Sequence, residues 1–373
     1  MVRREAEITV IGGGVVGLAT AFGLLRAGRR VRVLDGADSD LRASQGNFGL
    51  VWLQGKGAGF APYAQLSRDA VALWPDFAAE VQEASGIDLA LDQSGGYEFF
   101  TEADEFSAFK ADLEAQEATL GNRFSHEVIP GDDLRRSFPE IGPGVVGATF
   151  CPLDGHVNPL RLLRGLRVAV TALGGEIVQG AKVEKVTPVA SGFEMALENG
   201  SRLDAPRVVL CAGLGAAPLA AQLGFATRVR AQRGELLITE KLETRLPFLS
   251  STIRQVDEGG LQIGGTKAEV GPDDRETREM MAGLAQHAVT VLPALADVRV
   301  LRAWGALRVM SPDGYPVYTR SAAHPAAAMV TCHSGVTLAA FHGTKLADWL
   351  EDTAAAPDLE AFDEHRFALS ASA

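Results

Sequence analysis

Hydrophobic and polar positions near the N-terminus follow the order expected for a strand, a helix and a second strand. Ile8–Ile11 is a short, largely β-branched run of the kind that forms buried parallel strands. The glycine-rich segment Gly12–Gly17 opens an apolar stretch that ends near Gly28, as a helix would. Val31, Val33 and Leu34 mark the next strand, and it closes on Asp35. The pattern therefore predicts a strand–turn–helix–strand unit over residues 8–35.

A similar pattern returns later in the chain. Pro159 suits the first position of a helix, and the glycine pair at 174–175 ends that helix before another apolar pair. Residues 182–186 read as a further strand, and Val208–Leu210 reads as a buried one. We therefore expect these segments to join the first unit in one α/β domain.

Two stretches between these units have a different pattern of residues. Residues 91–145 combine the strand-like sequence YEFF with an acidic helix, Glu102–Thr119. Residues 225–303 contain RGELLITE and GGLQIGGTKAEV, which are typical of antiparallel strands. The pattern predicts a second domain, built on an antiparallel sheet and inserted into the first.

Composition and charge exclude several classes of protein. The chain has 373 residues, a formal net charge of −12 and no long basic run, which argues against nucleic-acid binding. Its three cysteines are scattered without metal-ligand spacing, so we expect a reduced, cytoplasmic protein with no metal site. Ile8–Leu25 is uncharged, but its clustered glycines make a poor membrane span, so no transmembrane segment is expected. Peripheral membrane association and oligomeric state stay open.

The first unit carries a dinucleotide-binding fingerprint. Gly12, Gly14 and Gly17 have the GxGxxG spacing, which allows a tight turn, close approach of a pyrophosphate and close packing of helix on strand. The helix N-terminus offers free N–H groups to the phosphates. Asp35 follows at the distance expected for an acid that binds a ribose, which argues against a 2′-phosphate and so against NADP. NAD and FAD remain, beside the alternative of a glycine-rich turn in an ordinary α/β domain.

The next segment favours FAD. Ala43–Gly49 is rich in small residues, and a backbone without side chains can pass close to a flat ring. The alternative is an exposed surface loop. Five of the six residues in Phe48–Leu53 are large and apolar, which argues against that alternative.

Together these segments resemble the D-amino-acid oxidase/glycine oxidase family of FAD-dependent amine oxidoreductases. The resemblance rests on VIGGGVVGLATAFGLLRAGRRVRVLD, ASQGNFG, HVNPLRLLRGLRVAVTALGGEI, PRVVLCAGLGA, ALRVMSPDGYPVY and CHSGVTLAAFHGTKLADWL. These segments occur in the family's order and span most of the chain. GNFGLVWLQGKG looks most like the branch that contains opine, hydroxyproline and iminodiacetate oxidases or dehydrogenases.

The resemblance implies an α/β fold with a Rossmann-like, GR2-type FAD-binding domain and an antiparallel-sheet substrate domain, as in glycine oxidase. The FAD-binding domain would comprise residues 1–90, 146–224 and 304–373, and the substrate domain residues 91–145 and 225–303. FAD would be noncovalent, since the attachment position of sarcosine-oxidase-like enzymes looks like Pro316 here. The implied cofactor contacts are Gly12, Gly14, Val15, Val16, Gly17, Asp35, Gly36, Ala43, Ser44, Gln45, Asn47, Phe48, Gly49, Leu50, Val183, Ala212, Gly213, Gly305, Leu307, Arg308, Ser334, Gly335, Val336, Thr337 and Leu338.

Four residues are implied in catalysis or substrate binding. Arg308 matches the family's carboxylate-binding arginine, although Val309 replaces the usual proline; a structural ion pair is the alternative role. Lys56 could bind a second carboxylate or assist the reaction with oxygen, and a solvated lysine is the alternative. Arg254 is expected to line the substrate pocket. His333 is expected beside the flavin or in a structural role rather than as a base.

The implied reaction is oxidation of the C–N bond of a secondary amino acid, such as an N-substituted glycine, an iminodiacetate-like compound or an opine. Hydride would pass to flavin N5, and water would hydrolyse the imine to a 2-oxo acid such as glyoxylate plus an amine. Electrons would go to O2 in an oxidase. Two alternatives remain: a dehydrogenase subunit that passes electrons to a redox partner or quinone, and a flavin-binding module without amine chemistry.

Overall fold

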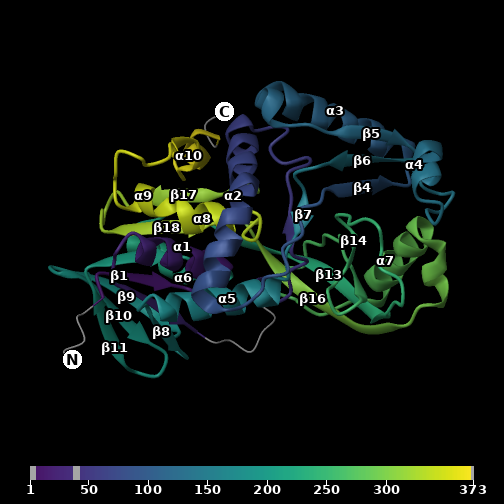
Figure 1. Cartoon of the computed structure of the whole chain (residues 1–373). Coiled ribbons are helices and arrows are strands. Elements are labelled where there is room, and N and C mark those ends of the chain that lie inside the picture. Colours follow the sequence, from purple (N-terminus) through teal and green to yellow (C-terminus); the bar gives the residue numbers. More distant parts are fainter. Residues whose placement is uncertain (1–5, 37–42, 371–373) are drawn as a thin grey trace.

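One half of the molecule is built on a six-stranded sheet and the other half on antiparallel sheets (Figure 1). The structure is a computed structural model that describes residues 6–36 and 43–370. Neighbouring strands of the six-stranded sheet are parallel except at one edge, where β17 is antiparallel to β18. The strands are, in order, β17 (Val317–Arg320), β18 (Ala327–Thr331), β12 (Arg207–Leu210), β1 (Ile8–Ile11), β2 (Val31–Asp35) and β8 (Glu176–Gln179).

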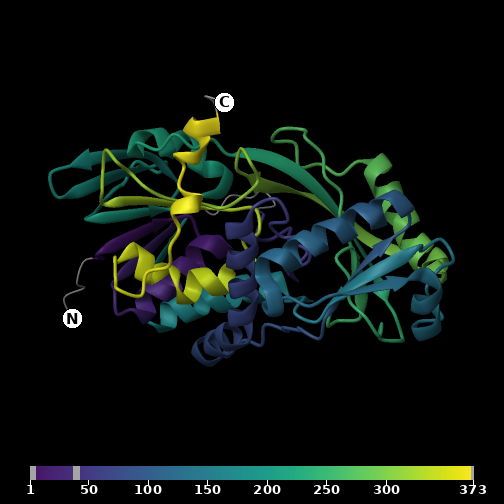
Figure 2. The same cartoon turned by 90° about the horizontal axis from the view of Figure 1, so that it is seen from above.

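Side chains alternate between the two faces of this sheet and build two cores. On β1, Val10 packs into the core on the helical face, whereas Ile11 packs into the core on the opposite face. Val209 and Val208 of β12 divide in the same way. Figure 2 shows the resulting layers, with the helices on one side of the sheet and a three-stranded antiparallel sheet on the other.

The helices on the first face pack on one another as well as on the sheet. They are α1 (Val15–Arg26), α2 (Ala61–Ser85), α5 (Pro159–Ala172), α8 (Ala339–Thr344) and α9 (Leu346–Leu350). The covering sheet on the second face consists of β9 (Val183–Val189), β10 (Gly192–Leu197) and β11 (Arg202–Ala205). Two short helices, α6 (Ala217–Ala220) and α10 (Arg366–Ser370), complete this half.

The other half contains two antiparallel sheets that share a third core. One consists of β4 (Gly96–Phe100), β6 (Gly147–Cys151) and β5 (Glu127–Pro130), with α3 (Ala103–Leu120) and α4 (Gly131–Ser137) beside it. The second consists of β14 (Ile253–Gln255), β15 (Gly260–Ile263), β13 (Arg230–Lys241) and β16 (Val300–Met310), with α7 (Arg278–Val291) against β13. A small pair, β3 (Leu50–Val51) with β7 (Gly155–His156), lies between the halves.

The expected fold class is confirmed, because the parallel sheet begins with the predicted strand–turn–helix–strand unit and antiparallel sheets stand beside it. The domain boundaries remain a proposal. Strand pairing runs across the expected boundaries at 145/146 and 303/304. β6 pairs with β4 and β5, and β16 pairs with β13 along most of its length. No helix within the described ranges is both long enough and apolar enough to cross a bilayer.

The contact between α2 and α8 has no room for a side chain at Gly343. A Cβ atom there would lie 2.4 Å from the ring of Phe77, which is fully buried. We therefore predict that Gly343→Ala lowers the free energy of unfolding by about 1–3 kcal/mol, the usual cost of overpacking a core. Chemical denaturation of the FAD-loaded protein measures this.

Gly283→Ala is the matched control, because Gly283 lies in α7 and a Cβ there meets nothing within 4 Å. Alanine should leave stability unchanged or raise it by up to about 1 kcal/mol through its helix propensity. Equal stability of both variants would contradict the packing described here.

Candidate active site

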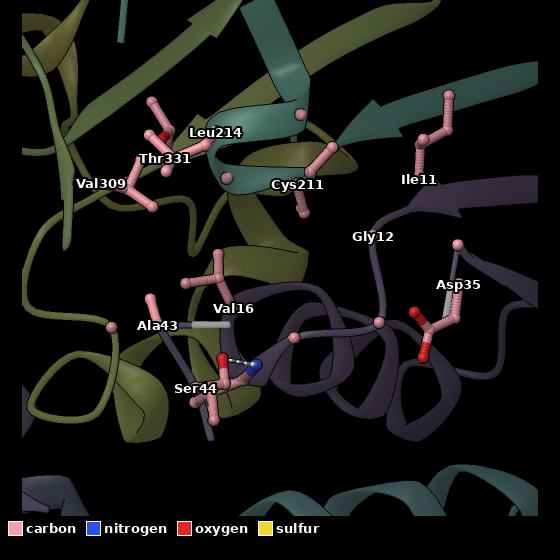
Figure 3. Close-up of a pocket in the computed structure, with 18 of the residues that line it drawn as sticks. Ile11, Gly12, Val16, Asp35, Ala43, Ser44, Cys211, Leu214, Val309 and Thr331 are labelled. Atoms are coloured by element: carbon pink, nitrogen blue, oxygen red, sulfur yellow. Dashed lines mark hydrogen bonds between the residues drawn. The ribbon is translucent and has the colours of Figure 1, made fainter. Parts of the chain in front are cut away.

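A cavity of about 480 Å³ lies at the carboxyl ends of the parallel strands. This is the position at which open α/β sheets bind dinucleotides. Figure 3 shows the turn after β1, the end of β2 and the end of β12 around it. Its lining comprises Ile11–Val16, Leu34–Gly36, Ala43, Ser44, Asn47, Ala181–Val183, Cys211–Gly215, Pro218, Leu219, Pro272, Asp274, Leu307, Val309, Val330–His333, Gly335 and Val336.

The turn between β1 and α1 approaches its neighbours so closely that only glycine fits. Gly12 has φ +119°, and a Cβ there would lie 2.5 Å from the Cys211 carbonyl oxygen. A Cβ on Gly13 would lie 2.6 Å from the Asp35 carboxyl group. At Gly14 only the Ser44 hydroxyl is near, at 3.0 Å, so a side chain at this position would enter the cavity.

The N-terminus of α1 faces the cavity without a cap of its own. Gly14 occupies the N-cap position and has no side chain to bond the first N–H groups. Ser44, from the segment after β2, accepts a hydrogen bond of 3.0 Å from the Val15 backbone N–H (Figure 3). The positive end of the helix dipole is therefore directed at the space a phosphate would occupy.

Asp35 ends β2 at the edge of the cavity and is almost fully buried. One carboxylate oxygen accepts a hydrogen bond of 2.8 Å from Arg167 of α5. This ion pair fixes the acid at the end of its strand. Its position fits the ribose contact expected from the fingerprint.

The predicted cofactor residues divide between those that line this cavity and those that do not. The lining includes Gly12, Gly14, Val15, Val16, Asp35, Gly36, Ala43, Ser44, Asn47, Val183, Ala212, Gly213, Leu307, Gly335 and Val336. The others lie outside it: Gly17, Gln45, Phe48, Gly49, Leu50, Gly305, Arg308, Ser334, Thr337 and Leu338.

Several residues outside the lining have a visible packing role. A Cβ on Gly17 would lie 2.0 Å from the Gly12 carbonyl oxygen, so Gly17 lets α1 pack onto β1. A Cβ on Gly305 would lie 2.1 Å from the Asp274 carbonyl oxygen, so Gly305 lets the loop before α7 cross β16. The same loop brings Pro272 and Asp274 into the cavity lining. The sequence analysis did not predict these two residues as part of the site.

Three cationic side chains, Lys56, Arg308 and Lys267, lie near His333, which lines the cavity. Burial and the charges of Lys56, Arg308 and Lys267 lower the pKa of His333 to about 3. Lys56 donates a hydrogen bond of 2.7 Å to the Ser334 hydroxyl, which also contacts His333 Nδ1 at 3.3 Å. Within residues 6–36 and 43–370, no carboxylate forms an ion pair with any of the three cations.

Arg308 lies on β16 opposite Gln232. Its guanidinium group donates a hydrogen bond of 3.2 Å to the Arg233 carbonyl oxygen and lies where a Cβ on Gly234 would be. Burial lowers the pKa of Arg308. A guanidinium held by one backbone carbonyl retains most of its donors for a ligand.

Arg254 has a different environment from the other predicted catalytic residues. It is almost fully buried, contacts His156 Nδ1 at 3.0 Å and donates a hydrogen bond of 2.7 Å to Gln262. Its guanidinium also lies over the Phe48 ring. Burial lowers the pKa of Arg254 to about 10 and that of His156 to about 4. These contacts join β14 and β15 to the 47–49 segment.

The fold and the cavity define a dinucleotide-binding protein of the α/β class. Residues 7–349 match the family model DAO, described as FAD dependent oxidoreductase. The chain is 40% identical to an opine oxidase subunit from Agrobacterium tumefaciens (strain Ach5), over 97% of this chain and 98% of that protein.

Solved structures have the same fold. Glycine oxidase from Geobacillus kaustophilus superposes with a TM-score of 0.86 at 23% identity, over 96% of this chain and 98% of that one. Iminodiacetate oxidase from Chelativorans sp. BNC1 gives a TM-score of 0.82 at 19% identity, over 95% of this chain and 98% of that one. The chain belongs to the DAO family of FAD-dependent oxidoreductases.

FAD is therefore the cofactor, as predicted, and the cavity fits it. The side-chain-free turn, the N-terminus of α1 and Asp35 are the features that a pyrophosphate and a ribose require. Among the described residues, no cluster of three or more His, Cys, Asp or Glu side chains could hold a metal ion.

Gly14→Val tests the cofactor site. The valine would occupy the cavity at the helix N-terminus while displacing only the Ser44 hydroxyl, so we predict a folded protein that has lost FAD. The flavin absorbance per protein and the circular dichroism spectrum measure these two properties. Gly59→Val is the control, because a Cβ at Gly59 meets only Tyr315 at 3.7 Å; normal flavin content in Gly14→Val would refute this site.

A second prediction concerns pH. Since the pKa of His333 is about 3, its ring is neutral at every pH well above that value and cannot produce an acid limb near neutrality. We expect the acid limb of flavin reduction to follow the pKa of the substrate amine and to persist in His333→Asn. The pH profile of anaerobic flavin reduction with two substrates of different amine pKa measures this. Loss of the limb in His333→Asn would assign it to the histidine.

Proposed function

We propose that this protein oxidises the C–N bond of a secondary amino acid that is N-substituted, iminodiacetate-like or opine-like. The observation that carries this proposal is the group of unpaired cations, Lys56, Arg308 and Lys267, around His333 at one end of the FAD cavity. The chain as a whole is acidic, with a net charge of −12, so the charge of this group is opposite in sign to that of the whole chain. It suits an anionic substrate.

Arg308 is proposed to bind the carboxylate of the arm that is oxidised. A guanidinium fork binds a carboxylate through two parallel hydrogen bonds, and partial burial strengthens them. The β16 strand gives it a rigid support, since the pairing with β13 continues on both sides of Arg308. Lys56, held by Ser334, is proposed to bind a second carboxylate on the other arm of the amine.

The proposed reaction requires little acid–base catalysis from the residues around the site. When bound, FAD would supply the redox chemistry by accepting a hydride, that is two electrons and one proton, from the substrate carbon beside the nitrogen. The neutral ring of His333 and the nearby cations favour the uncharged form of the amine, which carries the lone pair needed for oxidation. Oxidation gives an imine, and addition of water breaks its C–N bond to release a 2-oxo acid, such as glyoxylate, and the remaining amine.

Two electron acceptors are compatible with this half-reaction. An oxidase would reduce O2 to hydrogen peroxide. The 40% identical relative is named as a subunit of its oxidase, which favours a second candidate, a dehydrogenase subunit that passes its electrons to a partner. Peroxide formation by the purified chain with substrate distinguishes the two.

We also propose that FAD is bound noncovalently and that the protein is cytoplasmic. All three cysteines are buried free thiols, which supports a reducing compartment. Release of flavin into the supernatant after acid denaturation would support noncovalent binding, and flavin in the protein pellet would refute it.

Arg308 variants test the proposed function. Arg308→Leu should lower kcat/KM by about a hundredfold or more, because it removes a charge-assisted pair and misaligns the reacting carbon. Arg308→Lys keeps the charge but loses the fork, so it should be intermediate. Steady-state kinetics with an N-substituted glycine and with the corresponding decarboxylated amine measure this.

Flavin content is the internal control for these variants, because Arg308 lies outside the cavity lining. Unchanged kcat/KM in Arg308→Leu, or equal oxidation of the decarboxylated amine by the wild type, would place the carboxylate contact elsewhere. Failure of every amine to reduce the flavin would favour a flavin-binding module without amine chemistry.

A further inference from the structure

One serine hydroxyl in the segment between β18 and α8 has three polar partners. The Ser334 hydroxyl accepts hydrogen bonds of 2.7 Å from the Lys56 ammonium and 2.9 Å from the Tyr63 hydroxyl. It also lies 3.3 Å from His333 Nδ1. Ser334 and Tyr63 are both buried, so these partners rather than bulk water determine where the serine proton lies.

The number of donors and acceptors decides the direction of the bond to His333. A serine hydroxyl has two lone pairs and one proton, and an ammonium such as that of Lys56 can only donate. Lys56 and Tyr63 occupy the two lone pairs, so the serine proton is directed at His333 Nδ1. In the reverse arrangement Ser334 would donate to Tyr63, and the buried Tyr63 proton would have no acceptor among the described residues. A buried donor without an acceptor is disfavoured, so the first arrangement holds.

This arrangement fixes the tautomer of His333. Burial and the charges of Lys56, Arg308 and Lys267 lower the pKa of His333, so its ring is neutral. A neutral imidazole has one N–H group and one acceptor nitrogen. Since Nδ1 accepts the Ser334 proton, the N–H group of the ring is on Nε2.

The Nε2–H group of His333 is available to a ligand. It has no acceptor within residues 6–36 and 43–370, and it is not sealed in the core as His342 Nδ1 is. His333 lines the cavity that fits FAD. Figure 3 shows Thr331, two residues before His333, across this cavity from Asp35, the acid expected at the ribose. His333 therefore belongs to the side of the cavity that is left for the flavin ring.

We propose that His333 Nε2–H donates a hydrogen bond to an acceptor atom of the flavin ring, and that Ser334 and Tyr63 are positioning residues that keep the proton on that nitrogen. This inference depends on the FAD cofactor and goes beyond the proposed amine oxidation. Reduction adds negative charge to the flavin ring, and a preorganised donor stabilises developing charge. A neutral imidazole does so without the desolvation cost of a further buried cation. His333 thereby raises the midpoint potential of the flavin.

The alternative is a structural role in which Ser334 only ties the segment before α8 to α2. Such a role does not depend on which nitrogen of His333 carries the proton. Two variants separate these roles. Glutamine in place of His333 can put an amide N–H near the position of Nε2, whereas asparagine reaches only the position of Nδ1.

Nitrogen NMR of the FAD-loaded protein with isotope-labelled histidine rings tests the tautomer. The signals lost in His333→Gln identify His333. Wild type should show an unprotonated Nδ1 and a protonated Nε2 near neutral pH. Tyr63→Phe frees one lone pair of Ser334, so the proton should then distribute between both ring nitrogens. A protonated Nδ1 in the wild type would overturn the inference.

Tyr315→Phe is the matched control for Tyr63→Phe. The two tyrosine rings pack with their centroids 5.3 Å apart, so both substitutions remove a phenol oxygen from the same region. The Tyr315 hydroxyl makes no hydrogen bond to Ser334 or His333 in the described part of the chain. Its loss should therefore leave the His333 signals as in the wild type, and the same change in both variants would overturn the role of Tyr63.

The midpoint potential of the flavin, measured by reductive titration without any amine, tests the contact itself. His333→Asn should lower the equilibrium constant for reduction about tenfold, the range of a charge-assisted hydrogen bond, which is about 30 mV for two electrons. His333→Gln should keep most of the wild-type potential, and Tyr63→Phe should lie between wild type and His333→Asn. An equal fall in both His333 variants, or no change in either, would overturn the inference.

Calorimetry with an N-carboxymethyl amino acid distinguishes the flavin from the substrate as the acceptor. Weaker binding to His333→Asn at an unchanged midpoint potential would assign the Nε2–H group to the substrate and overturn the flavin contact. Failure of every amine to reduce the flavin would overturn the proposed function alone, because the tautomer and the midpoint potential are measured without turnover.

Discussion

The close approach of the β1–α1 turn to its neighbours is the constraint on which the rest of the site depends. Gly12 contacts the end of β12, Gly13 contacts Asp35, and Gly17 lets α1 rest on β1. These contacts align the ends of three parallel strands around one cavity and direct the N-terminus of α1 into it. The cofactor end of the site is therefore built mainly from backbone atoms. At these glycines a single added carbon atom would collide with its neighbours.

The segment that carries Lys56 depends on buried polar side chains. Gln116 is the one fully buried polar residue of α3, and its amide bonds the Gly55 N–H and the carbonyl oxygens of Leu53 and Lys56. Asp154 accepts hydrogen bonds from the Leu53 N–H and from Gln54, from the opposite side. The backbone N–H and carbonyl groups at both ends of the 53–56 segment are therefore hydrogen-bonded. These bonds hold Lys56 in the cationic group, although the segment belongs to no regular helix or strand. The position of Lys56 thus depends on α3 and on the turn that carries Asp154.

Sequence patterns predicted the fold well where chemistry and periodicity coincide. The unit over residues 8–35 appears as β1, α1 and β2, and the acidic helix expected at Glu102–Thr119 is α3 at Ala103–Leu120. The long helix α2 was not predicted, although Tyr63, Leu66, Ala70, Trp74 and Phe77 have helical spacing; Pro75 interrupts the helical composition of that stretch. Pro272 and Asp274 carry no motif, since only the crossing of distant segments brings them to the cavity. For the same reason, the sequence could not show the contacts of Arg254 with His156 and Gln262, and its expected place in the substrate pocket stays a prediction.

The most direct test of amine oxidation by this chain is a single-turnover experiment without oxygen. The FAD-loaded protein is mixed with an excess of an N-carboxymethyl amino acid, and the flavin absorbance and the 2-oxo acid are followed together. Loss of the oxidised flavin spectrum, with one equivalent of glyoxylate formed per flavin, is the expected result. A flavin that stays oxidised with every N-substituted amino acid tested, yet is reduced by dithionite, would contradict the proposed function.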